Sequence, residues 1–315
     1  MNMQTGKPEY AQLLCDFMFK RLFGSEANKD VLIGFLNMLL DDAEIEEVEF
    51  IQNEHLGLTE EDRKVIFDIS CKCKNGESFI IEMQKGYQQH FKKRAIYYTT
   101  YPINDQGRYA RELYIKDKAE GREDIRFKWD YNLKPVTVVA ILNFQFAHSH
   151  DWPENRYHSS YRLREDSTYE VMTDVLRFVF LELGRFNKSI WELETVYDKW
   201  MYLLKNMHKM DEIPKKFSDP LFRRLFLLAE IGNFTPEEHK QYLKSLENMG
   251  DYDNIINTTA EIAEKKGHEK GRAEGRIEGR IEGKVETARN LIELGLEVEV
   301  ISKATGLSIE EIQNL

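Results

Sequence analysis

Cysteine, proline and long apolar runs are scarce in this sequence of 315 residues. Its three cysteines, Cys15, Cys71 and Cys73, are too few for the disulfide framework of a small secreted fold, and we interpret Cys71 and Cys73 as small buried side chains. No run approaches the ~20 apolar residues of a membrane-spanning helix, and the N-terminal stretch lacks the apolar core of a signal peptide. We therefore expect a cytoplasmic protein without a membrane segment.

An excess of positive charge is also absent. Lys and Arg number 44 against 55 Asp and Glu, a formal net charge of −11. Since Lys and Arg supply most of the non-specific affinity of proteins for nucleic acids, this balance argues against a broad DNA-binding surface. A local basic groove stays open, because six cations lie close together in the sequence: Lys72, Lys74, Lys85, Lys92, Lys93 and Arg94.

Residues 64–86 carry the clearest pattern, an alternation of apolar and polar side chains on both sides of Asn75-Gly76. A period of two on each side of a turn predicts a β-hairpin. A three-residue loop with Gly76 in the left-handed conformation brings the apolar rows into register. The predicted pairs are Cys71 with Phe79, Ile69 with Ile81, and Phe67 with Met83.

The same register sets Asp68 across from Glu82, with Gln84 one step along the same face. Directly opposed residues have Cβ atoms roughly 5 Å apart. Two carboxylates at that separation repel unless a cation lies between them, and Mg²⁺ commonly takes one or two carboxylates and keeps several waters. The pattern alone leaves a second interpretation open, in which Asp68 and Glu82 are solvated polar positions of an ordinary hairpin.

An Asp on one strand followed by Glu82-Met83-Gln84 on the next resembles the core of the PD-(D/E)XK nuclease superfamily. More narrowly, it is similar to the Rpn-like, transposase-associated branch, in which Gln replaces the usual lysine. Further stretches resemble other landmarks of that family, namely residues 16–24, 35–37, 90–98 and 181–188. The resemblance thus covers most of the chain.

This resemblance implies an Mg²⁺-dependent DNA endonuclease, with Mn²⁺ as a second usable ion. Asp68 and Glu82 would hold the metal, and Gln84 would orient the attacking water. Arg94 or Lys20 would supply the cation that Glu-x-Gln lacks. The alternative is a weak or inactive nuclease fold that acts as an oligomeric interaction protein in mobile-element or defence biology.

The expected fold class is α/β, a restriction-endonuclease-like mixed sheet core flanked by helices and followed by a helical region and a helical repeat tail. Helices are predicted at 9–24, 28–40, 87–100, 189–209 and 217–231, and further strands at 48–54, 135–146, 157–164 and 175–183. We interpret the polar stretch 105–129 as a charged insertion, either a solvated loop or a substrate-side flap. His148, His150 and His158 are interpreted as loop histidines rather than metal ligands.

We divide the chain into a nuclease-like core at 1–188, a helical region at 189–263, a Gly-Arg-x-Glu repeat at 264–290 and a helical hairpin at 291–315. The repeat places an apolar row between a basic and an acidic row, which suits a parallel pair of helices, so we expect a homo-oligomer formed through this tail. A flexible linker is the alternative, because each glycine costs about 1 kcal/mol relative to alanine in a helix. The last segment resembles a helix-turn-helix, but Glu310-Glu311 at its second helix favours a hairpin for oligomerisation over a DNA reader.

Overall fold

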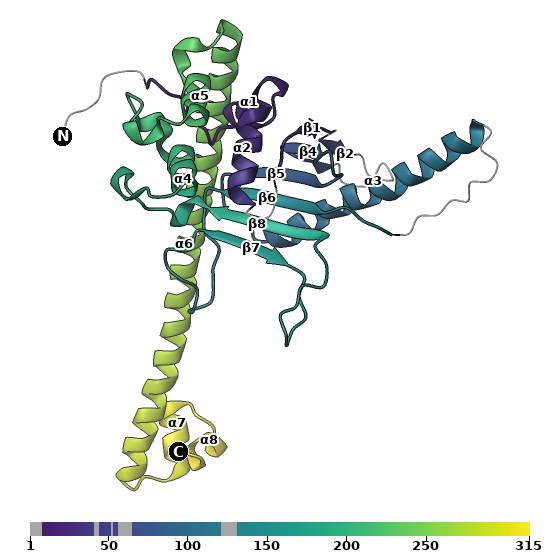
Figure 1. The fold of residues 1–315 in the computed structure, drawn as a ribbon. Helices are drawn as coiled ribbons and strands as arrows, with labels where there is room; N and C mark the ends of the chain where they lie inside the picture. The colour runs from purple at the N-terminus through teal and green to yellow at the C-terminus, as the bar shows by residue number, and fades with distance from the viewer. Residues whose placement is uncertain (1–7, 41–43, 52, 56–64, 121–130) are drawn as a thin grey trace. The chain divides into compact units, whose positions relative to one another are not determined.

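A six-stranded mixed sheet forms the centre of the computed structural model of this chain (Figure 1). The structure describes residues 8–40, 44–51, 53–55, 65–120 and 131–315. They separate into two compact units, Met1–Gly250 and Asp251–Leu315, which are described in turn.

The sheet has the strand order β1-β4-β5-β6-β8-β7. Its strands are β1 (Val48–Phe50), β4 (Ile69–Cys73), β5 (Ser78–Gln84), β6 (Val136–Leu142), β7 (His158–Arg162) and β8 (Leu176–Glu182). The neighbours β5, β6 and β8 are parallel, whereas the other pairs are antiparallel. A separate pair joins β2 (Glu54–His55) to β3 (Val65–Ile66). The mixed α/β sheet expected from the sequence is confirmed.

Helices cover both faces of this sheet. The first unit contains α1 (Asp16–Phe23), α2 (Lys29–Leu39), α3 (Phe91–Ala119), α4 (Val196–Asn206), α5 (Pro220–Ala229) and the start of α6 (Pro236–Glu293). Short 3₁₀ helices occupy Glu26–Asn28, Leu183–Arg185, Ile190–Glu192, Met207–Lys209, Lys215–Phe217 and Ile231–Asn233. Residues expected in the helical region thus supply α4 and α5; α4 packs against α2, and α5 packs against α1 and α2, in the same core as the sheet.

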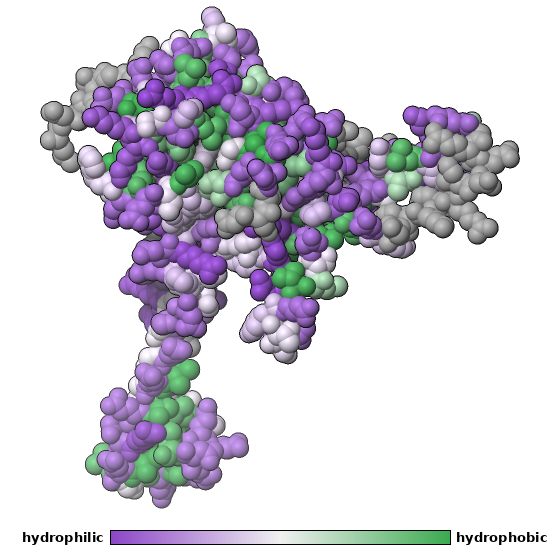
Figure 2. All heavy atoms as spheres, viewed as in Figure 1, coloured by the Kyte–Doolittle hydropathy of each residue, from purple (hydrophilic) through white to green (hydrophobic). Residues whose placement is uncertain are grey.

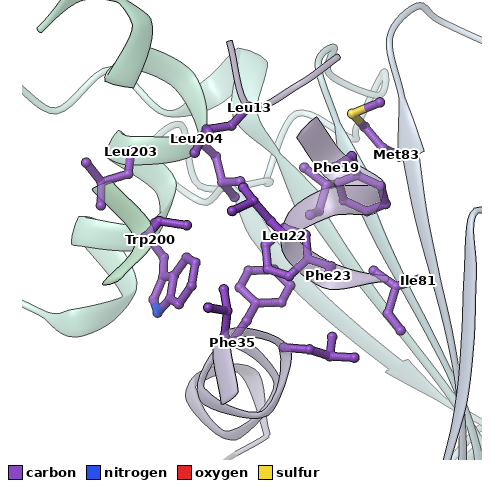
Figure 3. Close-up of a cluster of buried hydrophobic side chains, with 14 of the residues drawn as sticks. Leu13, Phe19, Leu22, Phe23, Phe35, Ile81, Met83, Trp200, Leu203 and Leu204 are labelled. Atoms are coloured by element: carbon purple, nitrogen blue, oxygen red, sulfur yellow. The ribbon is translucent and has the colours of Figure 1, made fainter. Parts of the chain in front are cut away.

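The larger part of the core lies between the sheet and α1, α2, α4 and α5 (Figure 3). Phe23 on α1, Phe35 on α2 and Trp200 on α4 are fully buried, with ring centroids 4.9 Å apart between Phe23 and Phe35 and 5.2 Å apart between Phe35 and Trp200. Full burial of one such side chain contributes about 1.5–3 kcal/mol. Ile81 and Met83 of β5 face this cluster, so alternate residues of β5 are left to face the opposite layer.

That opposite layer is α3, the crossover between the parallel strands β5 and β6. Its first turns bury Phe91, Ala95 and Tyr98 against the sheet, where Ile80 and Phe180 complete the contact. The helix was predicted to end near residue 100, but it continues through Pro102 to Ala119 and extends past the sheet in Figure 1.

The charged insertion expected from residue 105 is therefore helical up to Ala119, and the rest of it lies outside the described residues. Between residues 105 and 119 the chain has two Arg, two Lys and two Ala, which favour helix, and its side chains are exposed around most of the helix, Tyr109, Leu113 and Ile115 included. This part of α3 buries no apolar face, and its many charges were interpreted as an insertion.

The predicted helix at 9–24 is also shorter than expected, because α1 begins at Asp16. Before it, the chain is extended and pairs with the end of α5: the Ala11 N–H donates to the Ala229 carbonyl at 2.8 Å, and the Ile231 N–H donates to the Glu9 carbonyl at 3.0 Å. Leu13 and Leu14 are buried, but in this non-helical segment.

The second unit holds the end of α6 together with α7 (Val298–Thr305) and α8 (Ile309–Gln313). Ala288, Ile301 and Ile312 form its small core. The turn between the last two helices has Gly306 at φ 70°, and Ser308 begins α8 with a capping box that Glu311 closes. Among the described residues, no helix is long and apolar enough to cross a membrane.

Candidate active site

The hairpin of the sequence analysis is present, with one change at Asp68. Gly76 has φ 91°, and the pairs Ile69–Ile81 and Cys71–Phe79 have the predicted register. The first strand is not continuous, however, because a bend at Asp68 separates β3 from β4.

Phe67 therefore does not extend the apolar row of Ile69, and the predicted pairing of Phe67 with Met83 is wrong. Ile69 and Met83 belong to the cluster under α1, whereas Phe67 packs in the layer of α3, its ring centroid 5.1 Å from that of Tyr98. The bend inverts the alternation of side chains between the two faces of the sheet. The order of polar and apolar residues at 65–73 does not indicate this inversion.

The bend brings the Asp68 carboxylate into the hydrogen bonding of β5. The Met83 N–H donates to Asp68 Oδ2 at 2.8 Å, and the Asp68 N–H donates to Glu82 Oε1 at 3.2 Å. Each carboxylate thus accepts a main-chain N–H from the segment that carries the other. Asp68 and Glu82 are held together by this exchange rather than by direct opposition in the ladder.

Gln84 lies on the same face of β5 as Glu82, two residues further on. Its Nε2 donates to Glu82 Oε2 at 3.2 Å. Asn53 approaches from the other side, where its Nδ2 donates to the Asp68 carbonyl at 3.3 Å. The Oδ1 of Asn53 is buried and accepts no hydrogen bond from the described residues, so an acceptor oxygen is left over near the main chain of Asp68.

Arg94 on α3 brings a positive charge to this group. Its Nη1 donates to Gln88 Oε1, and its Cζ lies 5.0 Å from the ring centroid of Phe91 and 5.5 Å from that of Tyr98. Burial raises the pKa of both Asp68 and Glu82, and the guanidinium of Arg94 opposes that rise at both carboxyls. Its Nε is buried and has no partner among the described residues.

Lys20 lies at the margin of the site. It is exposed on α1 and its Nζ is 3.1 Å from Asp16 Oδ2. Burial has the largest effect on the pKa of Asp68 and raises it. The charge of Asp16 also raises this pKa, whereas the charge of Lys20 lowers it. The structure therefore brings Asp68, Glu82, Gln84 and Arg94 together, with Lys20 engaged by a neighbour.

Burial dominates the electrostatics of the pair. Glu82 is 2% exposed, and its burial, followed by the charge of Asp68, raises its pKa to about 8. Burial also raises the pKa of Asp68, although the hydrogen bond from the Met83 N–H opposes the shift. Tyr98 faces the same charges, and burial and then Glu82 raise the pKa of its phenol to about 12. With no cation between them, the two carboxyls hold a proton near neutral pH.

These donors fit a hard divalent cation. Asp68 and Glu82 supply carboxylate oxygens, and the side-chain amide of Gln84, which bonds to Glu82, holds a further oxygen. Within the described residues no group of three or more His, Cys, Asp or Glu side chains is arranged to hold a metal. A site with two carboxylates suits Mg²⁺ or Mn²⁺ better than a metal that requires a closed set of protein ligands.

Comparison with protein families gives a match over residues 13–259 to the family described as PD-(D/E)XK nuclease family transposase. The chain belongs to this family. The match extends from α1 through the sheet to α6 and includes Asp68, Glu82 and Gln84. No curated protein and no solved structure matches the chain. A PD-(D/E)XK nuclease family transposase has a nuclease- or transposase-related function, and the family implies DNA binding and the use of a divalent metal.

Several residues of this PD-(D/E)XK chain were missed or misjudged from the sequence. Asn53 and Tyr98 join the site only because the bend at Asp68 and the start of α3 bring them there. His148 lies in the loop after β6, as expected, but its side chain is buried and its Nε2 lies 2.7 Å from Oε1 of the buried Glu182. The sequence separates that pair by 34 residues, so spacing gives no signal for it. His158, also interpreted as a loop histidine, instead begins β7.

Proposed function

We propose that this chain is a metal-dependent DNA endonuclease that hydrolyses a phosphodiester bond, with Mg²⁺ or Mn²⁺ held by Asp68 and Glu82. The observation that carries the proposal is the pair of a buried Glu82 and a half-buried Asp68, which exchange main-chain hydrogen bonds beside an arginine. A protein has little reason to bury Glu82 next to a second carboxylate unless a cation binds between them, because the pair is costly without one. Once bound, the ion supplies Lewis-acid stabilisation of the phosphate and a more acidic water.

The remaining residues act by position and charge. Gln84 is held by Glu82 and can orient an attacking water with its amide, but an amide does not take up a proton near neutral pH. Arg94 supplies a fixed cation for the charge that develops on the scissile phosphate. We expect cleavage to be slower than with a lysine at position 84, because Gln84 adds neither a charge nor a proton-transfer group.

We also propose that the chain self-associates through the repeat in α6. Its basic row is Arg272, Arg276, Arg280 and Lys284, and its acidic row is Glu274, Glu278, Glu282 and Glu286. These rows flank an apolar row in which Ile281 is 54% exposed, so a second copy offers complementary charge and apolar surface. Light scattering of wild type and Ile281→Glu tests this, since the variant should have a lower molar mass. Equal masses would argue for a linker.

Cleavage of supercoiled plasmid with Mg²⁺ or Mn²⁺ tests the endonuclease proposal. We expect nicking by the wild type and its loss in Asp68→Ala and Glu82→Ala. Glu49→Ala is the matched control, because Glu49 is an exposed acid on the neighbouring strand β1. If all four proteins behave alike with both metals, the enzyme proposal fails. The glutamine at position 84, in place of the usual lysine, would then be consistent with a lack of catalysis. Together with the net charge of −11, it would favour an inactive nuclease fold that acts as an interaction protein.

A further inference from the structure

A pocket of about 280 Å³ opens between the first turn of α3 and the loop that follows β6. The side chains that matter for its chemistry are Tyr87, His90, Lys92, Lys93 and Phe146. Its described lining contains two lysines and no acidic side chain. In a chain with a net charge of −11, such a pocket is a local site for an anion.

The lysines of this pocket are available to a ligand, and one of them is fixed. Lys92 Nζ lies 4.6 Å from the ring centroid of Phe146 and 5.5 Å from that of Tyr161, distances at which a cation is attracted to the ring faces. Within the part of the chain that the structure describes, neither Lys92 nor Lys93 pairs with a carboxylate. Their charges are not neutralised by the protein.

The wall opposite the lysines is held by a buried network. Glu182, 1% exposed at the end of β8, accepts the Phe146 N–H at 2.7 Å through Oε2. Arg185 Nη2 donates to the Phe146 carbonyl at 3.2 Å, so both main-chain groups of that residue are engaged. His148 bonds to the other oxygen of Glu182 and stacks on Trp152, with ring centroids 3.8 Å apart. These hydrogen bonds fix the wall of the pocket, so its shape does not depend on mobile side chains alone.

The pocket lies along the same edge of the sheet as the carboxylate pair. Gln84 at the end of β5 aligns with Leu142, which aligns with Glu182 at the end of β8, so Gln84 and Glu182 are two strand spacings apart, or roughly 10 Å. Gln84 bonds to Glu82 of the carboxylate pair, and Glu182 bonds to Phe146 of the pocket. Lys92 and Lys93 directly precede Arg94 on α3. Phosphates of one DNA strand follow each other at about 3.4 Å along the helix axis, so a distance of this size spans only a few nucleotides.

We infer that this pocket binds a non-scissile phosphate of the DNA strand, a few nucleotides from the bond that is cut. The inference rests on the proposed endonuclease function and names how its substrate is held. Lys92 and Lys93 contact the phosphate, whereas Glu182, His148 and Arg185 are positioning residues that hold the loop against it.

Equilibrium binding of a short labelled duplex in Ca²⁺, over a range of salt concentrations, tests the pocket. Each phosphate contact contributes about 0.9 to the slope of log K against log salt. Lys92→Ala/Lys93→Ala should therefore lower that slope by about 1 to 2 and weaken binding. Lys116→Ala/Lys118→Ala removes the same charge from exposed positions at the far end of α3 and should leave the slope unchanged.

A second arm uses duplexes in which one phosphate near the cut site is replaced by a neutral methylphosphonate. One such position should weaken binding by the wild type and have no further effect on Lys92→Ala/Lys93→Ala. If both double variants keep the wild-type slope, or lose the same amount, the pocket is not a phosphate site. Metal-dependent nicking with an unchanged slope would overturn this inference alone, and a changed slope without nicking would overturn the endonuclease proposal alone.

Discussion

Replacing Glu82 by glutamine should change how the stability of the protein depends on pH. The Glu82 carboxyl has a pKa of about 8 in the folded protein, against 4.5 for an ordinary glutamate. When folding raises the pKa of a group, its stabilising contribution is fully present at pH values below the pKa of the unfolded state. That contribution disappears as the pH rises toward the pKa of the folded state. The metal-free wild type should therefore lose stability between about pH 4.5 and pH 8.

The expected loss is on the order of 5 kcal/mol, since each pKa unit corresponds to about 1.4 kcal/mol. Glu82 is 2% exposed, so solvent screens this effect little. The amide of the Glu82→Gln variant has no charge to bury, and its oxygen can still accept the Asp68 N–H, as Glu82 Oε1 does at 3.2 Å. Glu82→Gln should thus be more stable than the wild type near pH 8 and similar to it near pH 4.5.

Denaturant unfolding in EDTA, repeated at several pH values, measures this difference, with Glu49→Gln as the exposed control on β1. Excess Mg²⁺ should reverse the order above about pH 8, because the ion stabilises only a protein that binds it. Parallel stability curves for wild type and Glu82→Gln across the pH range would refute the electrostatic account of the pair.

Substitutions at four other positions have clear expected outcomes. Arg94→Ala removes a charge that lowers the Glu82 pKa, so the pH profile of nicking should move to higher pH, and Arg94→Lys should restore part of the shift. His148→Ala leaves the buried Glu182 without one donor and should cost about 1–3 kcal/mol in urea unfolding, whereas an unchanged stability would show that this contact does not support the fold. Gly184→Ala should destabilise by about 1–3 kcal/mol, because its Cβ would lie 3.0 Å from the backbone of Phe144. Gly279→Ala meets nothing within 4 Å and should raise helix content by circular dichroism, with a gain of about 1 kcal/mol.

The sheet was predictable because its strands carry strong local patterns. The alternation around Asn75-Gly76 gave the register of β4 with β5, and the continuous apolar run of β6 gave a strand buried on both faces. The viewed face of the first unit is largely hydrophilic in Figure 2, which agrees with apolar side chains being buried between layers. The capping boxes of Thr235 with Glu238 and of Ser308 with Glu311 likewise join residues three apart in the sequence.

The bend at Asp68 could not be predicted from the sequence, because it depends on a long-range exchange. Asp68 leaves the ladder so that its carboxylate can accept the Met83 N–H, and the cost of the broken strand is offset only when β5 is in place. Local alternation continues through the bend and conceals it. The structure brings Asp68 and Glu82 together, as expected. They are joined by hydrogen bonds to main-chain N–H groups, however, and not by direct opposition in the ladder.

The network of Glu182 and His148 was missed for a similar reason. Its members belong to β8 and to the loop after β6, and only the parallel pairing of those strands brings them together. The length of α3 was missed for a different reason, since its second half is exposed and buries no apolar face. Contacts between distant segments and elements without a buried face are the features that a single sequence conceals.

The most direct test of the central claim is Mn²⁺ binding by the full chain, followed by electron paramagnetic resonance as a function of pH. We predict that the wild type binds Mn²⁺ with an affinity that rises toward about pH 8, as the Glu82 proton is released, and that Asp68→Asn and Glu82→Gln both lose this binding. Binding that is independent of pH, or equally tight in both variants, would contradict the assignment of Asp68 and Glu82 as the metal ligands of a nuclease.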